Sequence, residues 1–126
     1  MAAKAPAIVI CDDRAGDAQL LRQILESRSL HVTAIVANGK ELLEWCAKNP
    51  SAQPNILMDV IMPVLDGYAA FCDLKERNYP AKVIFLSVEG TPGFVRTVLT
   101  SGAVDYITKP FQREDVIARV KRALSS

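Results

Sequence analysis

The hydrophobic residues follow two patterns that alternate along the chain. Five short apolar runs are typical of buried strands, and each is followed by a longer stretch whose apolar residues recur every three or four positions. The runs cover residues 7–11, 32–37, 56–58, 82–87 and 105–108. Strands that alternate with helices imply right-handed crossovers and a parallel sheet covered on both faces. The pattern therefore predicts a doubly wound α/β fold.

The helical stretches carry their own start and stop signals. Asn38 followed by Glu41 resembles a capping box, and Thr91 before Pro92 pairs a cap residue with proline at the first helical position. Gly102 is a typical C-terminal stop for the helix that Pro92 begins. The apolar faces expected to pack on the sheet are Leu20, Leu21, Ile24 and Leu25; Tyr68, Phe71 and Leu74; and Val116, Ile117, Val120 and Leu124.

Composition favours one ordinary globular domain over residues 1–126, with its core between residues 7 and 124. Half of the 126 residues are apolar, and the formal charge of +1 gives no reason to expect binding to nucleic acid or to an anionic membrane. No segment approaches the roughly 20 apolar residues that a membrane span requires. The three cysteines are far apart and odd in number, which favours free thiols in a reducing cytoplasm.

Polar residues with compatible chemistry follow the predicted strands. Asp12 and Asp13 come after the first strand, Asp59 after the third, Ser87 at the end of the fourth and Lys109 after the fifth. The carboxyl ends of parallel strands lie at one edge of a sheet, so these residues are expected to converge. Three carboxylates would repel one another unless a cation lay among them, and their hard oxygen atoms suit Mg²⁺.

A carboxylate beside Mg²⁺, a lysine and a hydroxyl group has what aspartyl-phosphate chemistry needs. In this interpretation Asp59 is the nucleophile, Lys109 screens the phosphoryl charge and Ser87 orients a phosphoryl oxygen. A plainer interpretation has Asp12 and Asp13 capping the first helix, Ser87 in a turn and Lys109 in solvent. Compatible groups at four strand ends favour the chemical interpretation over this coincidence.

Five motifs make the chain similar to the receiver domain of bacterial two-component response regulators, and the resemblance runs from Ile8 to Leu124. The motifs are Asp12-Asp13; Asp59 followed by Met62-Pro63 and Asp66-Gly67; Ser87; Gly102-Ala103 with Asp105-Tyr106; and Lys109-Pro110-Phe111. The resemblance implies a flavodoxin-like (βα)5 fold whose five parallel strands have the order 2-1-3-4-5.

The resemblance also implies a role for each acidic residue. Asp59 would accept a phosphoryl group from a phosphohistidine on a sensor histidine kinase or a phosphotransfer protein. Asp13 and Asp59 would bind Mg²⁺ directly, together with the backbone carbonyl of Ile61, and Asp12 would bind it through water.

Further residues would bind the phosphoryl group or change conformation in response to it. Lys109 and Ser87 would hold its oxygen atoms, and Tyr106 would turn inward when Ser87 moves; Val88 and Phe111 are further switch or output positions. Tyr106 is equally well a half-buried core aromatic when judged from the residues alone. The output surface would comprise residues 91–101, 105–108 and the last helix.

Two departures from the family pattern concern access to the site. Val88 is bulkier than the usual alanine and would restrict a phosphodonor. Ile61 and Glu89 flank the expected route of attacking water, so the lifetime of the phosphorylated state does not follow from the sequence.

The expected function is a signalling switch that acts by binding proteins, not an enzyme, since it would promote only its own phosphorylation and dephosphorylation. Residues 37–41 and 109–112 resemble chemotaxis receivers, whose target is a flagellar switch. A phosphorelay shuttle and the receiver of a longer DNA-binding regulator remain alternatives.

Two other classes fit less well. A phosphohydrolase of the haloacid dehalogenase type needs a second acid two residues after the nucleophile, where this chain has Ile61. A nucleotide-binding flavodoxin relative would need a phosphate-binding loop after the first strand, and that loop is missing.

Overall fold

The computed structural model describes residues 6–60, 62, 65–88 and 92–125. Five strands and five helices alternate along these ranges. The strands are β1 (Ile8–Cys11), β2 (Ala34–Val36), β3 (Asn55–Asp59), β4 (Lys82–Ser87) and β5 (Asp105–Thr108). The helices are α1 (Ala15–Glu26), α2 (Gly39–Lys48), α3 (Gly67–Glu76), α4 (Pro92–Thr100) and α5 (Arg113–Ser125).

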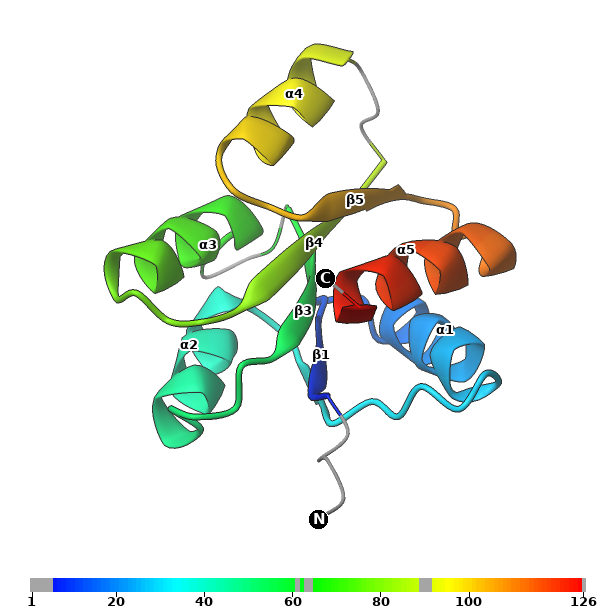
Figure 1. Ribbon diagram of the computed structural model, residues 1–126, viewed down its shortest axis with the longest axis horizontal. Helices are drawn as coiled ribbons and strands as arrows, with labels where there is room; N and C mark the ends of the chain where they lie inside the picture. Colours follow the sequence, from blue (N-terminus) through cyan, green and yellow to red (C-terminus); the bar gives the residue numbers. More distant parts are fainter. Residues whose placement is uncertain (1–5, 61, 63–64, 89–91, 126) are drawn as a thin grey trace.

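The strands form one parallel sheet with the order β2-β1-β3-β4-β5 (Figure 1). Both the α/β class and the strand order are therefore confirmed. Strand β2 is shorter than the predicted run 32–37. Just before β2, the Thr33 hydroxyl oxygen accepts a hydrogen bond from the Ile8 N–H at 3.2 Å, and the Thr33 N–H donates to the Ile8 carbonyl at 2.8 Å.

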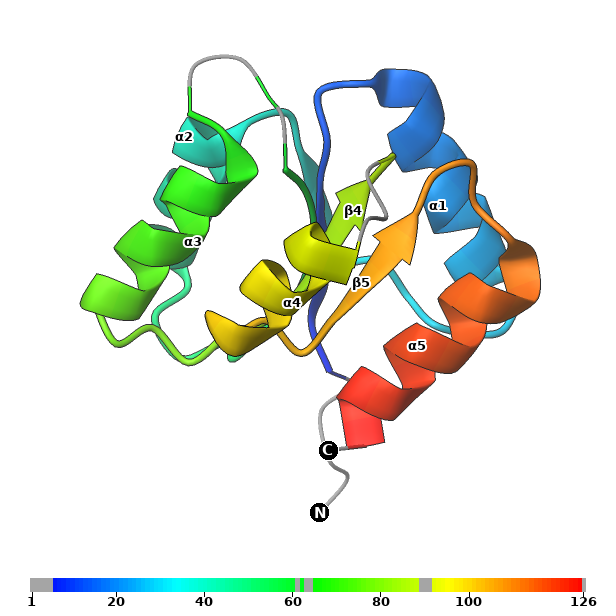
Figure 2. The same cartoon turned by 90° about the horizontal axis from the view of Figure 1, so that it is seen from above.

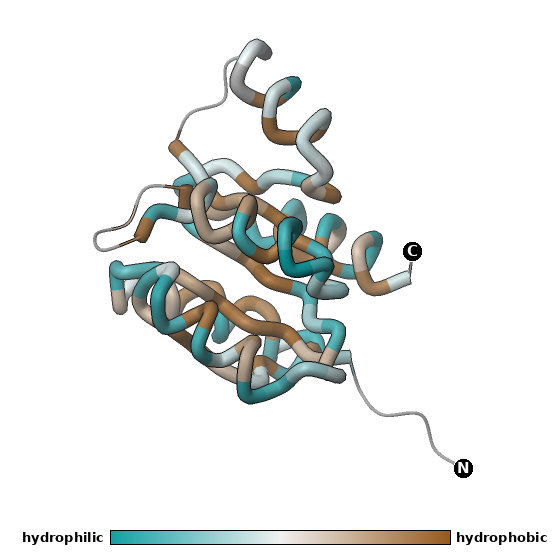
Figure 3. Tube along the Cα trace, turned by 90° about the vertical axis from the view of Figure 1, so that its left-hand side faces the viewer, coloured by the Kyte–Doolittle hydropathy of each residue, from teal (hydrophilic) through white to brown (hydrophobic). Residues whose placement is uncertain are grey.

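The helices cover the sheet on both faces, with α1 and α5 on one side and α2, α3 and α4 on the other (Figures 1 and 2). Successive strand residues point to opposite faces. In β1, Ile8 and Ile10 join the core under α1 and α5, whereas Val9 and Cys11 join the core under α2 and α3. The central strands are accordingly apolar between their ends, and brown segments run through the middle of the tube in Figure 3.

Two predicted core residues are wrong. Leu20 is 45% exposed and Tyr68 is 41% exposed. Consecutive helical residues are rotated by about 100° about the helix axis. Leu20 and Tyr68 therefore lie beside the buried face of their helices although one sequence neighbour of each is buried. In α1 the buried side is therefore Ala18, Leu21, Ile24 and Leu25. At the end of α5, Ala123 is buried and Leu124 only half-buried.

The helix ends are fixed largely as predicted. The Asn38 side chain accepts a hydrogen bond from the Glu41 N–H at 2.9 Å, and the Glu41 carboxylate accepts one from the Ala37 N–H at 2.9 Å. Gly102 has φ +113°, a conformation that L side chains rarely adopt, and it follows the last turn of α4. Thr91, the predicted cap of α4, lies outside the described residues.

The cysteines are free thiols, as predicted, with Cys11 and Cys46 buried and Cys72 half-buried. Across the described residues, no helix has the length and apolar character needed to span a membrane.

Candidate functional site

The end of β1 fixes the position of Asp12. The Asp12 N–H donates to the Val36 carbonyl at 3.1 Å and so extends the β1–β2 ladder by one bond. Its Oδ1 accepts a hydrogen bond from the Arg14 N–H at 3.0 Å, which turns the chain into α1. One carboxylate oxygen thus holds the backbone, and Oδ2 is left to act in the site.

The end of β3 holds Asp59 equally firmly. Asp59 is the last residue of this strand and pairs with Leu86 in β4. The next residue, Val60, donates to the Leu86 carbonyl at 3.2 Å and accepts from the Gly67 N–H at 2.8 Å. The start of α3 is therefore hydrogen-bonded to the backbone next to Asp59.

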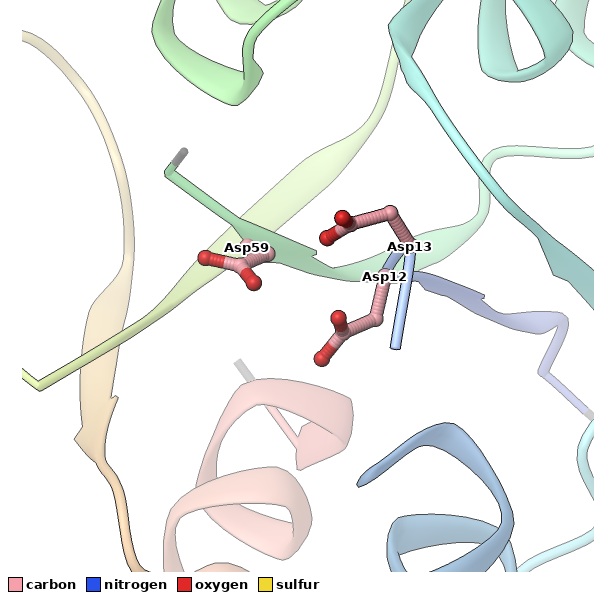
Figure 4. A group of neighbouring side chains, drawn as sticks. All are labelled: Asp12, Asp13 and Asp59. Atoms are coloured by element: carbon pink, nitrogen blue, oxygen red, sulfur yellow. The ribbon is translucent and has the colours of Figure 1, made fainter. Parts of the chain in front are cut away.

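The three predicted acids meet at the carboxyl edge of the sheet. One carboxylate oxygen from each of Asp12, Asp13 and Asp59 lies within 4.8 Å of the others. Asp12 and Asp59 are buried and Asp13 is exposed. Figure 4 shows the Asp13 carboxylate pointing from the end of β1 towards Asp59 across a shared space. The predicted convergence is therefore confirmed.

Lys109 lies among these acids with its side chain only 12% exposed. Its Nζ is 3.0 Å from an Oδ2 atom of each of Asp12, Asp17 and Asp59. Burial alone would lower the pKa of the lysine, but the hydrogen bonds that its ammonium group donates to the three carboxylates outweigh burial and raise the pKa above its usual value. The amine is consequently a fixed positive charge at neutral pH.

Ser87 and Val88 complete one wall of an open pocket of about 280 Å³ that also contains Asp13, Asp59 and Lys109. Ser87 is buried at the end of β4, and its carbonyl accepts a hydrogen bond from the Lys109 N–H at 2.9 Å. Val88 is 78% exposed at the edge of this pocket.

Three residues of the site were given no role in it by sequence reasoning, although Met62 is part of the motif that follows Asp59. Arg14 and Met62 line the same pocket, and Asp17 pairs with Lys109. An acid in the first turn of a helix is ordinarily explained by its favourable interaction with the helix dipole, so nothing in the sequence indicated that Asp17 belongs to the site. Only the packing of α1 beside the loop after β5 reveals its partner.

The predicted switch residues occupy different surroundings. Tyr106 is half-buried against the α2–α3 core, and the Arg119 guanidinium lies 5.3 Å from its ring centroid. Phe111 is half-buried and packs against the other core, under α1 and α5. The carbonyl of Ile61, predicted as a metal ligand, lies outside the described residues.

The donor set fits a small hard cation. All three clustered side chains offer carboxylate oxygens, and one of them is exposed to the pocket, where water or phosphate oxygens can enter. Mg²⁺ typically uses one or two carboxylates and keeps several waters. Carboxylate oxygens within 4.8 Å of one another, beside an open pocket, would suit such an ion.

Thiol chemistry at the site has no support. Burial, reinforced by nearby Asp12 and Asp59, raises the pKa of the Cys11 thiol well beyond its usual range. Its Sγ packs 3.6 Å from the Met62 Sδ. Cys11 is therefore a core residue beneath the pocket.

Comparison with known proteins assigns the family. Residues 8–121 match the model of the response regulator receiver domain. The chain belongs to this family. As a receiver it is 31% identical over 119 residues to the chemotaxis protein CheY of Bacillus subtilis, covering 94% of this chain and 97% of that protein. It is 34% identical over 117 residues to the transcriptional regulatory protein SrrA of Staphylococcus aureus, covering 93% of this receiver but 47% of SrrA.

Solved receivers share its fold. A chain of the CheX–CheY–BeF3–Mg²⁺ complex from Borrelia burgdorferi matches with a TM-score of 0.87 at 27% identity. The match covers 94% of this receiver and 88% of that chain. The receiver domain of the Francisella response regulator 1452 gives a TM-score of 0.84 at 30% identity, covering 95% of this receiver and 97% of that chain. Receivers of this family are signalling proteins, in agreement with the predicted class.

Proposed function

We propose that this receiver is a phosphorylation-activated switch whose phosphoryl acceptor is Asp59. The observation that carries the proposal is the position of its carboxylate, at the edge of an open pocket and 3.0 Å from the Lys109 amine. Asp12 and Asp13 supply the neighbouring carboxylates. A nucleophile, a fixed cation and a candidate metal site therefore share one cavity.

The reaction is a transfer of one phosphoryl group. A carboxylate oxygen of Asp59 attacks phosphorus, and the bond from phosphorus to the histidine nitrogen of the donor breaks. The electron pair of that bond stays on the donor nitrogen. Asp59 becomes an acyl phosphate, and later attack by water releases inorganic phosphate and restores the carboxylate.

Asp13 and Asp59 would hold Mg²⁺ directly, together with the Ile61 carbonyl, and Asp12 would hold it through water. When bound, this ion neutralises charge on the phosphoryl oxygens. The structural neighbour solved with BeF3 and Mg²⁺ supports this choice of ion.

Lys109 and Ser87 would bind the phosphoryl oxygens. The amine keeps its charge because its pKa is raised, and its three N–H donors point into a cluster of oxygen atoms. Because Ser87 ends β4 and lines the pocket, its hydroxyl can follow a new acceptor on Asp59. Movement of these two residues on phosphorylation would thus shift the end of β4 and the loop after β5.

Tyr106 would report that movement on the α4–β5–α5 surface, with Val88 and Phe111 as further switch positions. The Arg119 guanidinium beside the Tyr106 ring contributes about 0.5–1 kcal/mol to the present position of the ring. An inward turn has to offset the loss of this contact together with the associated packing change.

A chemotaxis-type role, with a sensor kinase upstream and a flagellar switch downstream, is supported by the similarity to CheY over nearly its whole length. The match to half of SrrA supports the alternative, the receiver of a longer regulator. A phosphorelay shuttle fits the same site. The free thiols agree with a reducing cytoplasm as the compartment.

The proposal is tested by incubating the protein with Mg²⁺ and acetyl phosphate and measuring the intact mass. We expect one added phosphoryl group that Asp59→Asn abolishes. Asp73→Asn, which removes a surface acid on α3, should leave labelling unchanged. Labelling that persists in Asp59→Asn would place the acceptor elsewhere.

The partner is tested with a pull-down that compares beryllofluoride-loaded and empty protein. A flagellar switch protein captured only by the loaded form supports the chemotaxis role. Capture of a phosphotransfer protein by the empty form instead supports the phosphorelay shuttle.

A further inference from the structure

Lys109 is saturated with hydrogen bonds in a way that conflicts with a metal at the same site. An ammonium group has three N–H donors, and the three carboxylates of Asp12, Asp17 and Asp59 each accept one at 3.0 Å. Two of these three acceptors, Asp12 and Asp59, also belong to the cluster that fits a cation. A metal and the lysine thus draw on the same two side chains.

A bound Mg²⁺ would weaken the hold of the protein on Lys109. The ion withdraws negative charge from Asp12 and Asp59, and it repels the ammonium group because both are positive. Without another partner, the amine would have to leave the pocket or oppose metal binding. The proposed function requires both cations to be present together when the phosphoryl group arrives.

Asp17 is the partner that avoids this conflict. It lies in the first turn of α1, and its side chain is 35% exposed. It is not a member of the carboxylate cluster that fits a metal. Its pairing with Lys109 can therefore persist when the other two carboxylates are engaged.

We propose that Asp17 is a positioning residue, which keeps Lys109 ion-paired at the pocket while Asp12 and Asp59 are engaged by Mg²⁺. This inference rests on the proposed function for the identity of the ion. In this role Asp17 differs from a residue in an ordinary surface ion pair, because it raises the affinity for Mg²⁺ by way of its contact with Lys109.

The consequence is a coupling between Asp17 and Lys109 in Mg²⁺ affinity. In Asp17→Asn the amine keeps only the carboxylates of Asp12 and Asp59 as charged partners, and the ion competes with it for both. We expect Mg²⁺ affinity to fall about fivefold to tenfold, within the usual range for interacting residues. In a Lys109→Met background there is no amine to displace, and the same substitution should weaken binding at most about twofold, through the loss of one nearby charge.

The experiment is isothermal titration of Mg²⁺ into the wild-type protein, the two single variants and the double variant. Asp73→Asn is the matched control, since Asp73 has the same 35% exposure and pairs with Arg77 on α3. Asp17→Glu keeps the charge and should restore most of the affinity. Circular dichroism verifies that each variant is folded, and Asp17→Ser repeats the test if the asparagine variant is not.

Three outcomes would overturn the inference. Equal losses in the wild-type and Lys109→Met backgrounds would mean that Asp17 acts on the ion only as a nearby charge. A loss no larger than that of Asp73→Asn, or a gain in affinity, would remove the role altogether. The titration does not depend on phosphorylation, so a failure of Asp59 labelling with acetyl phosphate would be recognised separately.

Discussion

Replacing Gly67 by alanine should destabilise the protein and displace Asp59, because the added methyl group would collide with the Asp59 backbone. Gly67 is the first residue of α3 and packs against the backbone of Asp59. A Cβ at this position would lie 2.0 Å from the Asp59 carbonyl oxygen and 3.1 Å from the Met58 Cγ. The first of these neighbours is backbone in a strand hydrogen-bonded on both sides, so it cannot turn away as a flexible side chain could.

The size of the effect follows from that distance. Cβ atoms essentially never approach other atoms closer than 3.0 Å, so α3 or the end of β3 must move by at least an ångström from the present 2.0 Å. Overpacking of this kind costs about 3 kcal/mol, near the upper end of the usual range, because the obstacle is backbone. A misplacement of about 1 Å at a reacting group can slow a reaction about 100-fold.

Urea unfolding monitored by circular dichroism measures the first effect, and the rate of labelling by acetyl phosphate measures the second. Gly16→Ala is the matched control, because Gly16 lies in the first turn of α1 and its added Cβ would meet nothing within 4 Å. This control should be neutral or more stable by about 0.5–1 kcal/mol. If Gly67→Ala matched Gly16→Ala in both stability and labelling rate, the close approach of α3 to Asp59 would be refuted.

Three further substitutions probe other contacts. Lys109→Met should destabilise the metal-free protein by about 3 kcal/mol because it removes the ammonium partner of buried carboxylates. Since the folded pKa of Lys109 is raised, its contribution to stability is complete below pH 10.5 and lost only above, so the urea unfolding curves of variant and wild type should converge at higher pH. Arg119→Ala should cost about 1–2 kcal/mol in the same assay, since Asp105 loses its close partner, whereas Arg119→Lys should recover part of this. Lys75→Met removes a hydrogen bond to the Ser101 carbonyl and should speed amide hydrogen exchange in the last turn of α4 but not in α1.

The fold followed from local patterns because each strand of a doubly wound sheet is buried on both faces. The run 7–11 has no polar residue, and in the structure Val9 and Ile10 are both fully buried although they face opposite cores. Such runs locate strands without any knowledge of their partners. The order of the strands came instead from the family resemblance, because periodicity carries no information about neighbours.

The site was predictable only as far as the strand ends. Asp12, Asp13 and Asp59 were found because parallel strands bring their carboxyl ends to one edge. Asp17 was missed because its contact with Lys109 joins residues 92 positions apart through the packing of α1 against the loop after β5. The exposure of Leu20 was missed for a related reason, since an apolar residue at the border of a helical stripe is buried only if a neighbouring element reaches it.

The charges of the pocket link the stability of the protein to its affinity for metal. In the metal-free protein Lys109 offsets the repulsion among the acids, so stronger ion pairs with Asp12 and Asp59 favour the folded state. The same pairs oppose a metal, because the ion has to take over those carboxylates. A substitution that weakens the hold of Asp12 and Asp59 on the amine should therefore lower metal-free stability and raise Mg²⁺ affinity together. Asp17 departs from this trade-off, because it stabilises the amine without being needed by the ion.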